Sequence, residues 1–318
     1  YMIYTVTLNP CLDYLVAVPD FKSGRVNRAG YERLMPGGKG INVAYALHIL
    51  KEPSLALGFV AGFTGSEIER IMSKDGIPHD FLPLKTGFSR IDVQMVDAIE
   101  SSINGIGPLA TQEDIDALCE KLQNLQDGDT IVLSGSVPRG AKDNVYGEIL
   151  RSISHKDLYV VVDAKRPLLL HTLKYRPFLI KPNMQEMTDI FFQDMSSVST
   201  DDIVRYMKTL QSMGARNILV SMGSAGALLL TEDGKIYHHS AMKGKVCNTV
   251  GCGDSMLAGF LSGFHKNHDM IEAFHLSLAA ASANAFHDGR GTYEQIMRLN
   301  SILQNESADV FTVAEQDA

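Results

Sequence analysis

The alternation of short apolar runs with longer amphipathic stretches is the feature that most constrains how this chain folds. The runs are rich in Val, Ile and Leu, which is typical of strands buried on both faces of a parallel sheet. The stretches between them repeat their apolar residues every three to four positions, as helices do. The pattern predicts a doubly wound α/β fold, in which helices cover both faces of a mostly parallel sheet.

The positions of the predicted elements follow from this alternation. Central strands are predicted at about 2–8, 55–61, 129–134, 158–163, 178–181 and 216–222. Helices are predicted between them at 41–51, 66–74, 112–125, 144–152 and 203–213, and in the C-terminal part at 252–263, 270–285 and 292–304. We see no internal repeat and no long linker in the chain.

Two segments in the N-terminal third break the alternation of strands and helices. Residues 13–35 and 88–103 are strand-like, with stretches of period two, and no helix separates them from their neighbours. We interpret them as two insertions that together form one small β-sheet lid. In this interpretation the α/β core consists of 1–12, 36–87 and 104–318.

Composition and charge exclude several classes of protein. The 318 residues include 29 basic and 37 acidic ones, a formal net charge of −8, which argues against binding to nucleic acid or to an anionic membrane. The four cysteines include no C-x-x-C pair, which indicates reduced thiols. No apolar run approaches the roughly 18 residues of a membrane span, and the first residues lack the features of a signal peptide. We therefore expect a cytoplasmic protein.

The strongest local motif is Thr249-Val-Gly251-Cys-Gly253-Asp254, which leads into an apolar helix. Glycines at the start of a helix let a ligand approach the backbone, and the free N–H groups there favour an anion. Asp254 does not suit an anion site unless it serves as a base or faces a metal. The alternative is that Asp254 only caps the helix.

A second glycine-rich turn surrounds Lys39 in the stretch 36–44, Pro-Gly-Gly-Lys-Gly-Ile-Asn-Val-Ala. It too could hold an anion, with Lys39 as a mobile charge, although for this motif taken alone an ordinary turn with an exposed lysine is the favoured alternative. It is not a Walker loop, because Arg33 stands where the first glycine should be. The Thr249 motif is not a dinucleotide fingerprint, because Met256 occupies the position of its third glycine.

The order of the motifs along the chain carries a family resemblance. The motifs are Thr7-Leu-Asn9-Pro10 with Asp13, Gly37-Gly-Lys-Gly-Ile-Asn42-Val-Ala44, Leu133-Ser-Gly-Ser136-Val-Pro138, Ile180-Lys181-Pro-Asn183-x-x-Glu186, Val220-Ser-Met-Gly223-x-x-Gly226 and Thr249-Val-Gly251-Cys-Gly253-Asp254. Together they resemble the phosphofructokinase B family of ribokinase-like carbohydrate kinases over essentially the whole chain. The Thr-Leu-Asn-Pro opening and the lysine in the glycine turn most resemble its branch of 1-phosphofructokinases and tagatose-6-phosphate kinases.

The resemblance implies an activity and its cofactors. It implies a ribokinase-like fold with ATP as phosphoryl donor, Mg²⁺ as helper and a phosphorylated ketohexose as acceptor. The first candidate reaction converts fructose 1-phosphate to fructose 1,6-bisphosphate, and the alternative converts tagatose 6-phosphate to tagatose 1,6-bisphosphate. A different class, a regulator that binds a sugar phosphate without catalysis, also stays open, although such a sensor would have no need of the base Asp254.

The resemblance also assigns roles to residues around the transferred phosphoryl group. Asp254 would be the catalytic base. The backbone N–H groups of Gly251, Cys252 and Gly253 would stabilise the charge on the transferring group, with Cys252 in place of the usual alanine. The substrate would be held by Asp13, Gly38, Lys39, Asn42, Arg90 and Ser136. For Asp13 the alternative is a turn-forming aspartate, and the lid residues Arg25 and Arg28 are as well explained by solvation as by ligand binding.

The remaining assignments concern the nucleotide, the metal and the oligomer. Residues matching the family's nucleotide-binding positions are Lys181, Asn183, Ser221, Gly223, Gly226 and Asn284. Asn183 and Glu186 would order metal-bound water, since both lie on one helical face, but an ordinary helix start explains them equally well. Lys165 and Arg166 depart from the family pattern, and their role stays open. The exposed edges of the lid leave room for a homodimer.

Overall fold

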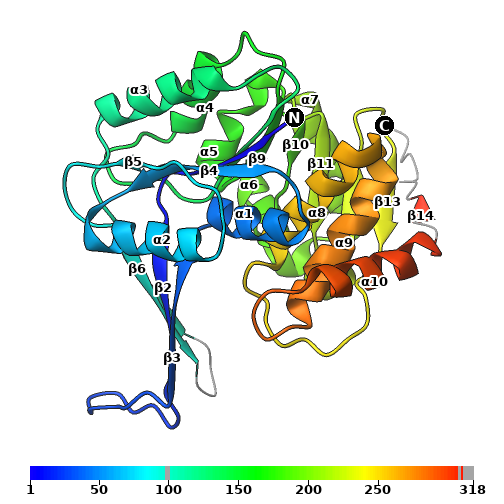
Figure 1. Ribbon diagram of the computed structural model, residues 1–318. Helices are drawn as coiled ribbons and strands as arrows, with labels where there is room; N and C mark the ends of the chain where they lie inside the picture. Colours follow the sequence, from blue (N-terminus) through cyan, green and yellow to red (C-terminus); the bar gives the residue numbers. More distant parts are fainter. Residues whose placement is uncertain (97–100, 307–308, 311–318) are drawn as a thin grey trace.

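The computed structural model describes residues 1–96, 101–306 and 309–310. Among these residues a ten-stranded sheet forms the centre of the molecule (Figure 1). In spatial order its strands are β14 (Asp309–Val310), β13 (Ile236–His239), β12 (Ala227–Leu230), β11 (Asn217–Ser221), β10 (Leu179–Ile180), β9 (Tyr159–Asp163), β8 (Thr130–Ser134), β1 (Ile3–Thr7), β4 (Ser54–Val60) and β5 (Leu82–Pro83). The strands from β11 to β5 pair in parallel, and β12, β13 and β14 are antiparallel.

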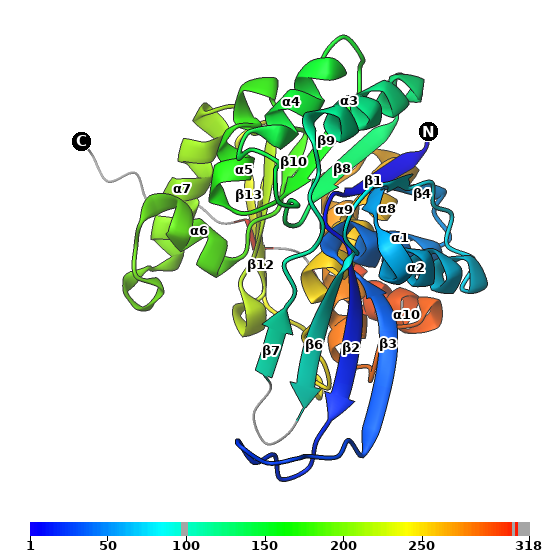
Figure 2. The same cartoon turned by 90° about the vertical axis from the view of Figure 1, so that its left-hand side faces the viewer.

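Helices cover both faces of this sheet (Figures 1 and 2). They are α1 (Lys39–Ile49), α2 (Gly62–Lys74), α3 (Gln112–Lys121), α4 (Val145–Ser152), α5 (Arg166–Leu170), α6 (Met184–Phe191), α7 (Thr200–Ser212), α8 (Cys252–Asn267), α9 (Met270–Ala285) and α10 (Tyr293–Gln304). Side chains of α3 to α7 form one apolar layer with the sheet, and α1, α8, α9 and α10 form the other, with α2 beside α1. The predicted doubly wound α/β architecture is therefore confirmed.

Several element boundaries differ from the predictions. The predicted helix 112–125 ends as an α-helix at Lys121 and continues as a 3₁₀ turn, Leu122–Asn124. The predicted strand 178–181 is reduced to two paired residues in β10. The short helix α5 was not predicted, because five residues are too few to show a clear helical period. The start of α6 at Asn183 agrees with the helix-start alternative, although no bounds were predicted for this helix. None of the described helices combines the length and apolarity that a membrane span requires.

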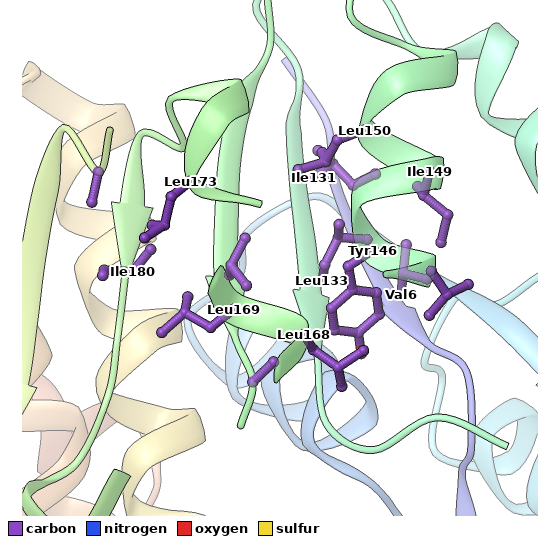
Figure 3. Packing of buried hydrophobic residues seen from close by; sticks show 14 of the residues in the cluster. Val6, Ile131, Leu133, Tyr146, Ile149, Leu150, Leu168, Leu169, Leu173 and Ile180 are labelled. Atoms are coloured by element: carbon purple, nitrogen blue, oxygen red, sulfur yellow. The ribbon is translucent and has the colours of Figure 1, made fainter. Parts of the chain in front are cut away.

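Tyr146 of α4 shows how packing positions the loops at one end of the sheet (Figure 3). Its side chain is fully buried in the apolar cluster that includes Leu133 of β8 and Val6 of β1. Its hydroxyl donates a hydrogen bond of 3.1 Å to the carbonyl of Gly135, directly after β8. This contact anchors the backbone that follows the strand.

A smaller sheet projects from the main body (Figures 1 and 2). Its four strands are, in order, β3 (Tyr31–Gly37), β2 (Cys11–Ala17), β6 (Arg90–Val96) and β7 (Ser101–Asn104). Strands β2 and β6 pair in parallel, with Cys11 opposite Arg90 and Asp13 opposite Asp92, so the two strand-like segments do form one sheet. The sheet extends beyond the predicted segment 13–35 at both ends.

Parts of the predicted domains lie outside the described residues. These are 97–100 of the predicted lid segment and 307–308 and 311–318 of the predicted core.

The strand order locates the point at which a ligand site is expected. From β1 the chain moves to β4 on one side, and it later returns to β8 on the other side of β1. Ligands of doubly wound folds bind at such a switch point, outside the carboxyl ends of the strands. The smaller sheet joins the core at this same end, because β2 follows β1 after only three residues.

Candidate active site

The N-terminus of α8 forms a cradle of backbone amides. Gly251 is the N-cap residue, with a φ of 75°, a left-handed conformation that glycine adopts without strain. The side-chain amide of Asn284 donates to Val250 O at 2.9 Å and fixes the preceding loop. The amide of Cys252 already donates to Thr249 O at 3.4 Å. The amide of Gly253 lies in the first turn, where helices leave N–H groups without an intrahelical partner, so this end suits an anion.

Asp254 lies in the first turn of α8 and is buried. The helix has no side-chain cap, so Asp254 is not the N-cap carboxylate of the alternative interpretation. Its Oδ2 accepts a hydrogen bond of 2.9 Å from Asn42 Nδ2. Burial and the nearby Asp163 raise the pKa of Asp254 to about 6, against the opposing effects of Lys181, Asn42 and Lys39. At neutral pH Asp254 is therefore a carboxylate with the basicity of a general base.

Asp163, at the end of β9, links two lysines. Its Oδ1 lies 2.8 Å from Lys39 Nζ, and its Oδ2 lies 3.3 Å from Lys181 Nζ. The Asp163 side chain is fully buried and that of Lys181 nearly so. Burial alone raises the pKa of Asp163, but Lys181 and Lys39 outweigh it and hold the pKa below its usual value. The site thus contains fixed positive charges despite the acidic composition of the chain.

Asn183 and Glu186 form a capping box at the start of α6. Asn183 Oδ1 accepts from the backbone N–H of Glu186 at 2.8 Å, and Glu186 Oε2 accepts from that of Asn183 at 3.0 Å. An ordinary helix start, the alternative to a metal site, therefore accounts for Asn183 and for one oxygen of Glu186. The other oxygen, Glu186 Oε1, lies 3.2 Å from Lys39 Nζ. Asp163 and Glu186 hold the pKa of Lys39 above its usual value, although burial opposes them.

The smaller sheet contributes Asp13 and Arg90 to the same end of the molecule. Arg90 Nη1 lies 2.6 Å from Asp92 Oδ2, and its Nε donates to Asn9 O at 3.1 Å. Asp13 lies within β2 and not in a turn, and its Oδ1 accepts a hydrogen bond from Cys11 Sγ at 3.0 Å. Burial raises the pKa of Asp13.

Three predicted substrate residues lie around the start of α1. Gly38 is its N-cap, with a φ of 112°, and its carbonyl accepts from the backbone N–H of Asn42 at 2.9 Å. A Cβ at Gly135 would lie 3.6 Å from Lys39 Cβ, so the loop after β8 passes beside Lys39. Ser136 is exposed in this loop.

The predicted nucleotide residues differ in how open their surroundings are. Ser221 bridges to Asn183 at the ends of neighbouring strands, and Gly223 has open space where a Cβ would be. Gly226, in contrast, packs against the backbone of β13, where a Cβ would overlap His239 O, so it does not offer an open surface. Asn284 is buried and uses its amide on the α8 cradle, within 3.4 Å of Cys252 Sγ.

Four basic residues with open roles lie away from these contacts. Arg25 and Arg28 are exposed in the loop between β2 and β3, and Lys165 is exposed before α5. The Arg166 guanidinium lies over the Phe192 ring, 4.1 Å from its centroid.

Sequence reasoning gave no role to two residues that the structure places in the site. Asp163 had a usable signal, an aspartate at the carboxyl end of the buried run Tyr-Val-Val-Val-Asp. Arg290 lies between α9 and α10, and its Nη2 is 3.4 Å from Asn42 Oδ1. Its local sequence, Gly-Arg-Gly, indicates a turn but not this contact.

The donor groups of the site fit ATP and Mg²⁺. Free helix amides and two lysines suit the phosphates of a nucleotide. Asp163 and Glu186 offer carboxylate oxygens, which Mg²⁺ prefers. Asp163 Oδ2 is buried, and Lys181 Nζ, 3.3 Å away, is not in hydrogen-bonding geometry with it. A basic carboxylate, an amide cradle and fixed cations at the switch point define a phosphotransferase.

Comparisons with known proteins agree with this class. Residues 6–295 match the family model described as pfkB family carbohydrate kinase, and the chain belongs to this family. A 1-phosphofructokinase of Bacillus subtilis (strain 168) is 42% identical over 298 residues, which cover 94% of this chain and 97% of the relative. A D-tagatose-1-phosphate kinase of Bacillus licheniformis is 35% identical over 303 residues, covering 95% of this chain and 99% of the relative. The predicted family resemblance is therefore confirmed.

A solved structure shares the fold. Phosphofructokinase-2 from Escherichia coli, in complex with substrates and products, matches with a TM-score of 0.89 at 23% identity. The match covers 96% of this chain and 100% of that one.

Proposed function

We propose that this protein is an ATP-dependent kinase of a ketohexose monophosphate, which converts fructose 1-phosphate to fructose 1,6-bisphosphate. The observation that carries the proposal is Asp254, a buried carboxylate with a pKa of about 6 in the first turn of α8. Its position beside free helix amides suits a base that acts next to a transferring phosphoryl group. The name of the Bacillus subtilis relative supports the choice of substrate.

In the proposed reaction Asp254 accepts the proton of the free primary hydroxyl of the sugar as that hydroxyl attacks the γ-phosphoryl group. The amides of Gly251 and Gly253 stabilise the charge that develops there, and that of Cys252 joins them by giving up its 3.4 Å bond to Thr249 O. Mg²⁺, when bound, neutralises phosphate charge, and the oxygens of Asp163 and Glu186 would hold it. The smaller sheet acts as a lid that keeps water from the reacting groups.

The acceptor is expected to be a ketohexose that carries its phosphate at C1. The D-tagatose-1-phosphate kinase from Bacillus licheniformis is named for a sugar phosphorylated at C1. The alternative substrate tagatose 6-phosphate therefore has weaker support than fructose 1-phosphate.

A panel of acceptors tests this proposal. Release of ADP would be followed with fructose 1-phosphate, tagatose 1-phosphate, tagatose 6-phosphate, fructose 6-phosphate and free fructose, each with ATP and Mg²⁺. We expect the highest kcat/KM with fructose 1-phosphate. Turnover confined to unphosphorylated sugars would contradict the proposal, and no turnover with any sugar would favour the regulator hypothesis.

Arg90 is expected to anchor the existing phosphate of the sugar. Its guanidinium is largely buried and held by Asp92, so it is oriented before the substrate arrives. Replacing Arg90 with Ala should raise KM for fructose 1-phosphate by a factor corresponding to about 1.5–3 kcal/mol, the range for a lost charge-assisted bond, and should leave KM for ATP nearly unchanged. Arg298→Ala, at an exposed position on α10, is the matched control. An unchanged KM for the sugar in R90A would place the anchor elsewhere.

Two finer expectations accompany the proposed function. The strands at both edges of the smaller sheet expose apolar side chains, Tyr31 and Leu34 on β3 and Ile103 on β7. We infer that a homodimer forms through this sheet, because unpaired strand edges favour association.

We also expect a cytoplasmic location, because the four cysteines are free and disulfides are rare in that compartment.

A further inference from the structure

The loop Asp288–Gly291 between α9 and α10 directs one arginine into the site. Gly289 has a φ of 127°, which other residues rarely adopt, and its carbonyl accepts from Asn248 Nδ2 at 3.4 Å. Gly291 lies so close to α9 that a Cβ there would be 2.7 Å from the backbone of Ala283. The two glycines therefore hold the loop against α9 and fix the position of Arg290 between them.

Arg290 packs on Tyr45 and reaches Asn42, both on α1. Its Cζ lies 3.8 Å from the centroid of the Tyr45 ring, a cation–π contact. Tyr45 is fixed in turn, because its hydroxyl donates to Asp75 Oδ2 at 2.7 Å. The Nη2 group of Arg290 points to Asn42 Oδ1 at 3.4 Å. This distance is long for a hydrogen bond, and the donor sits on a side chain that its neighbours hold in place.

The amide of Asn42 has two chemically different ends. A guanidinium only donates hydrogen bonds, so the end that faces Arg290 must be the oxygen. The NH₂ end is then directed to Asp254 Oδ2, at 2.9 Å. If the amide turned over, its oxygen would face the carboxylate and repel it. The ionised form of Asp254 would lose a donor and gain a neighbouring dipole of the wrong sign.

We propose that Arg290 is a positioning residue that holds the amide of Asn42 in the orientation that donates to Asp254. The inference rests on the proposed kinase function, because it assigns Arg290 a role in the basicity of the proposed base. Arg290 acts through Asn42 and does not touch the reacting atoms.

Other charged groups lie near Asp254 and near Arg290, the two ends of this chain of contacts. Asp254 is also influenced by Lys39 on α1, Asp163 after β9 and Lys181 after β10. The charges near Arg290 are Asp13, Asp75 and Arg33. None of these groups contacts the amide of Asn42 through a described hydrogen bond, so Arg290 is the described partner, besides Asp254 itself, that selects its orientation.

The experiment compares pH profiles of kcat/KM for Arg290→Met, Arg290→Lys, Asn42→Ala and the double variant R290M/N42A. In R290M the midpoint of the acid limb should move up by about one pH unit, the effect of losing one hydrogen bond to the charged form. KM for the sugar should change by less than about twofold. R290K keeps the charge but not the planar fork, so its midpoint should lie between those of wild type and R290M. Arg298→Met, an exposed arginine on α10, is the control for the loss of one positive charge.

The double variant separates positioning from other effects. If Arg290 acts only through Asn42, R290M/N42A should have the same acid limb as N42A. An acid limb that stays at the wild-type pH in both R290M and R290K, or a raised sugar KM with an unmoved limb, would overturn the inference and leave the kinase function intact. If the wild-type protein turned over no ketohexose phosphate, the proposed function and the inference would fail together.

Discussion

Replacing Asp254 with Asn is expected to lower kcat by about three to four orders of magnitude, at the upper end of the range for loss of a general base. Asparagine has nearly the same shape, and its oxygen can still accept the hydrogen bond from Asn42 that Asp254 accepts at 2.9 Å. It cannot accept a proton from the sugar hydroxyl. The geometry of the site should therefore survive while the chemistry fails.

The measurement for D254N combines turnover with binding. ADP release gives kcat, and calorimetry gives the affinity for fructose 1-phosphate and for a non-hydrolysable ATP analogue. Both affinities should stay within about tenfold of wild type. Asp201→Asn, at an exposed position in the first turn of α7, is the matched control and should keep the wild-type rate. An unchanged kcat in D254N would refute the assigned base.

The second large effect is expected on stability, in Asp163→Asn. Asp163 is fully buried between Lys39 and Lys181, with Nζ–O distances of 2.8 and 3.3 Å. Removing its charge leaves Lys181 buried without its ion-pair partner. Breaking a buried ion pair in this way costs about 3–5 kcal/mol. Urea denaturation of D163N should show a loss of this size in the free energy of unfolding.

The loss of unfolding free energy in D163N should become smaller at low pH. The pKa of Asp163 is held below its ordinary value of 3.8 in the folded protein. A carboxyl group with a lowered pKa stabilises the fold above its unfolded pKa, and this contribution disappears as the pH falls through the folded pKa. The difference between wild type and D163N should therefore be full near pH 7 and should shrink below about pH 4.

An exposed ion pair provides the control for D163N. Lys85 and Glu113 lie 3.7 Å apart, and their side chains are 85% and 86% exposed. Glu113→Gln should leave the urea midpoint essentially unchanged, because solvent screens such a pair. If D163N were as stable as E113Q, the charge cluster around Asp163 would not contribute to folding as described.

The sequence predicted the architecture because its signals were local. The apolar runs of β1, β4, β8, β9 and β11 are long enough to show their pattern, and the helices between them have clear periods. The short elements β5 and α5 lack such periods. Their structure depends on neighbours that are distant in the sequence.

A site residue could be placed from the sequence where the motif around it is compatible with a single local structure. The glycines before Asp254 do form the start of α8. The Asn183–Glu186 spacing, in contrast, serves a capping box and a metal-water pair equally well, and only the structure shows the capping bonds. Arg290 meets Asn42 across 248 positions of the chain, so no local pattern could reveal the contact.

In the proposed function the protein transfers the γ-phosphoryl group of ATP to a ketohexose that already carries a phosphate. ³¹P NMR of the wild-type protein with ATP, Mg²⁺ and fructose 1-phosphate tests it most directly. We expect a second phosphate monoester on the sugar, at C6, in step with the formation of ADP. Formation of ADP and inorganic phosphate without a new ester, or no reaction at all, would contradict it.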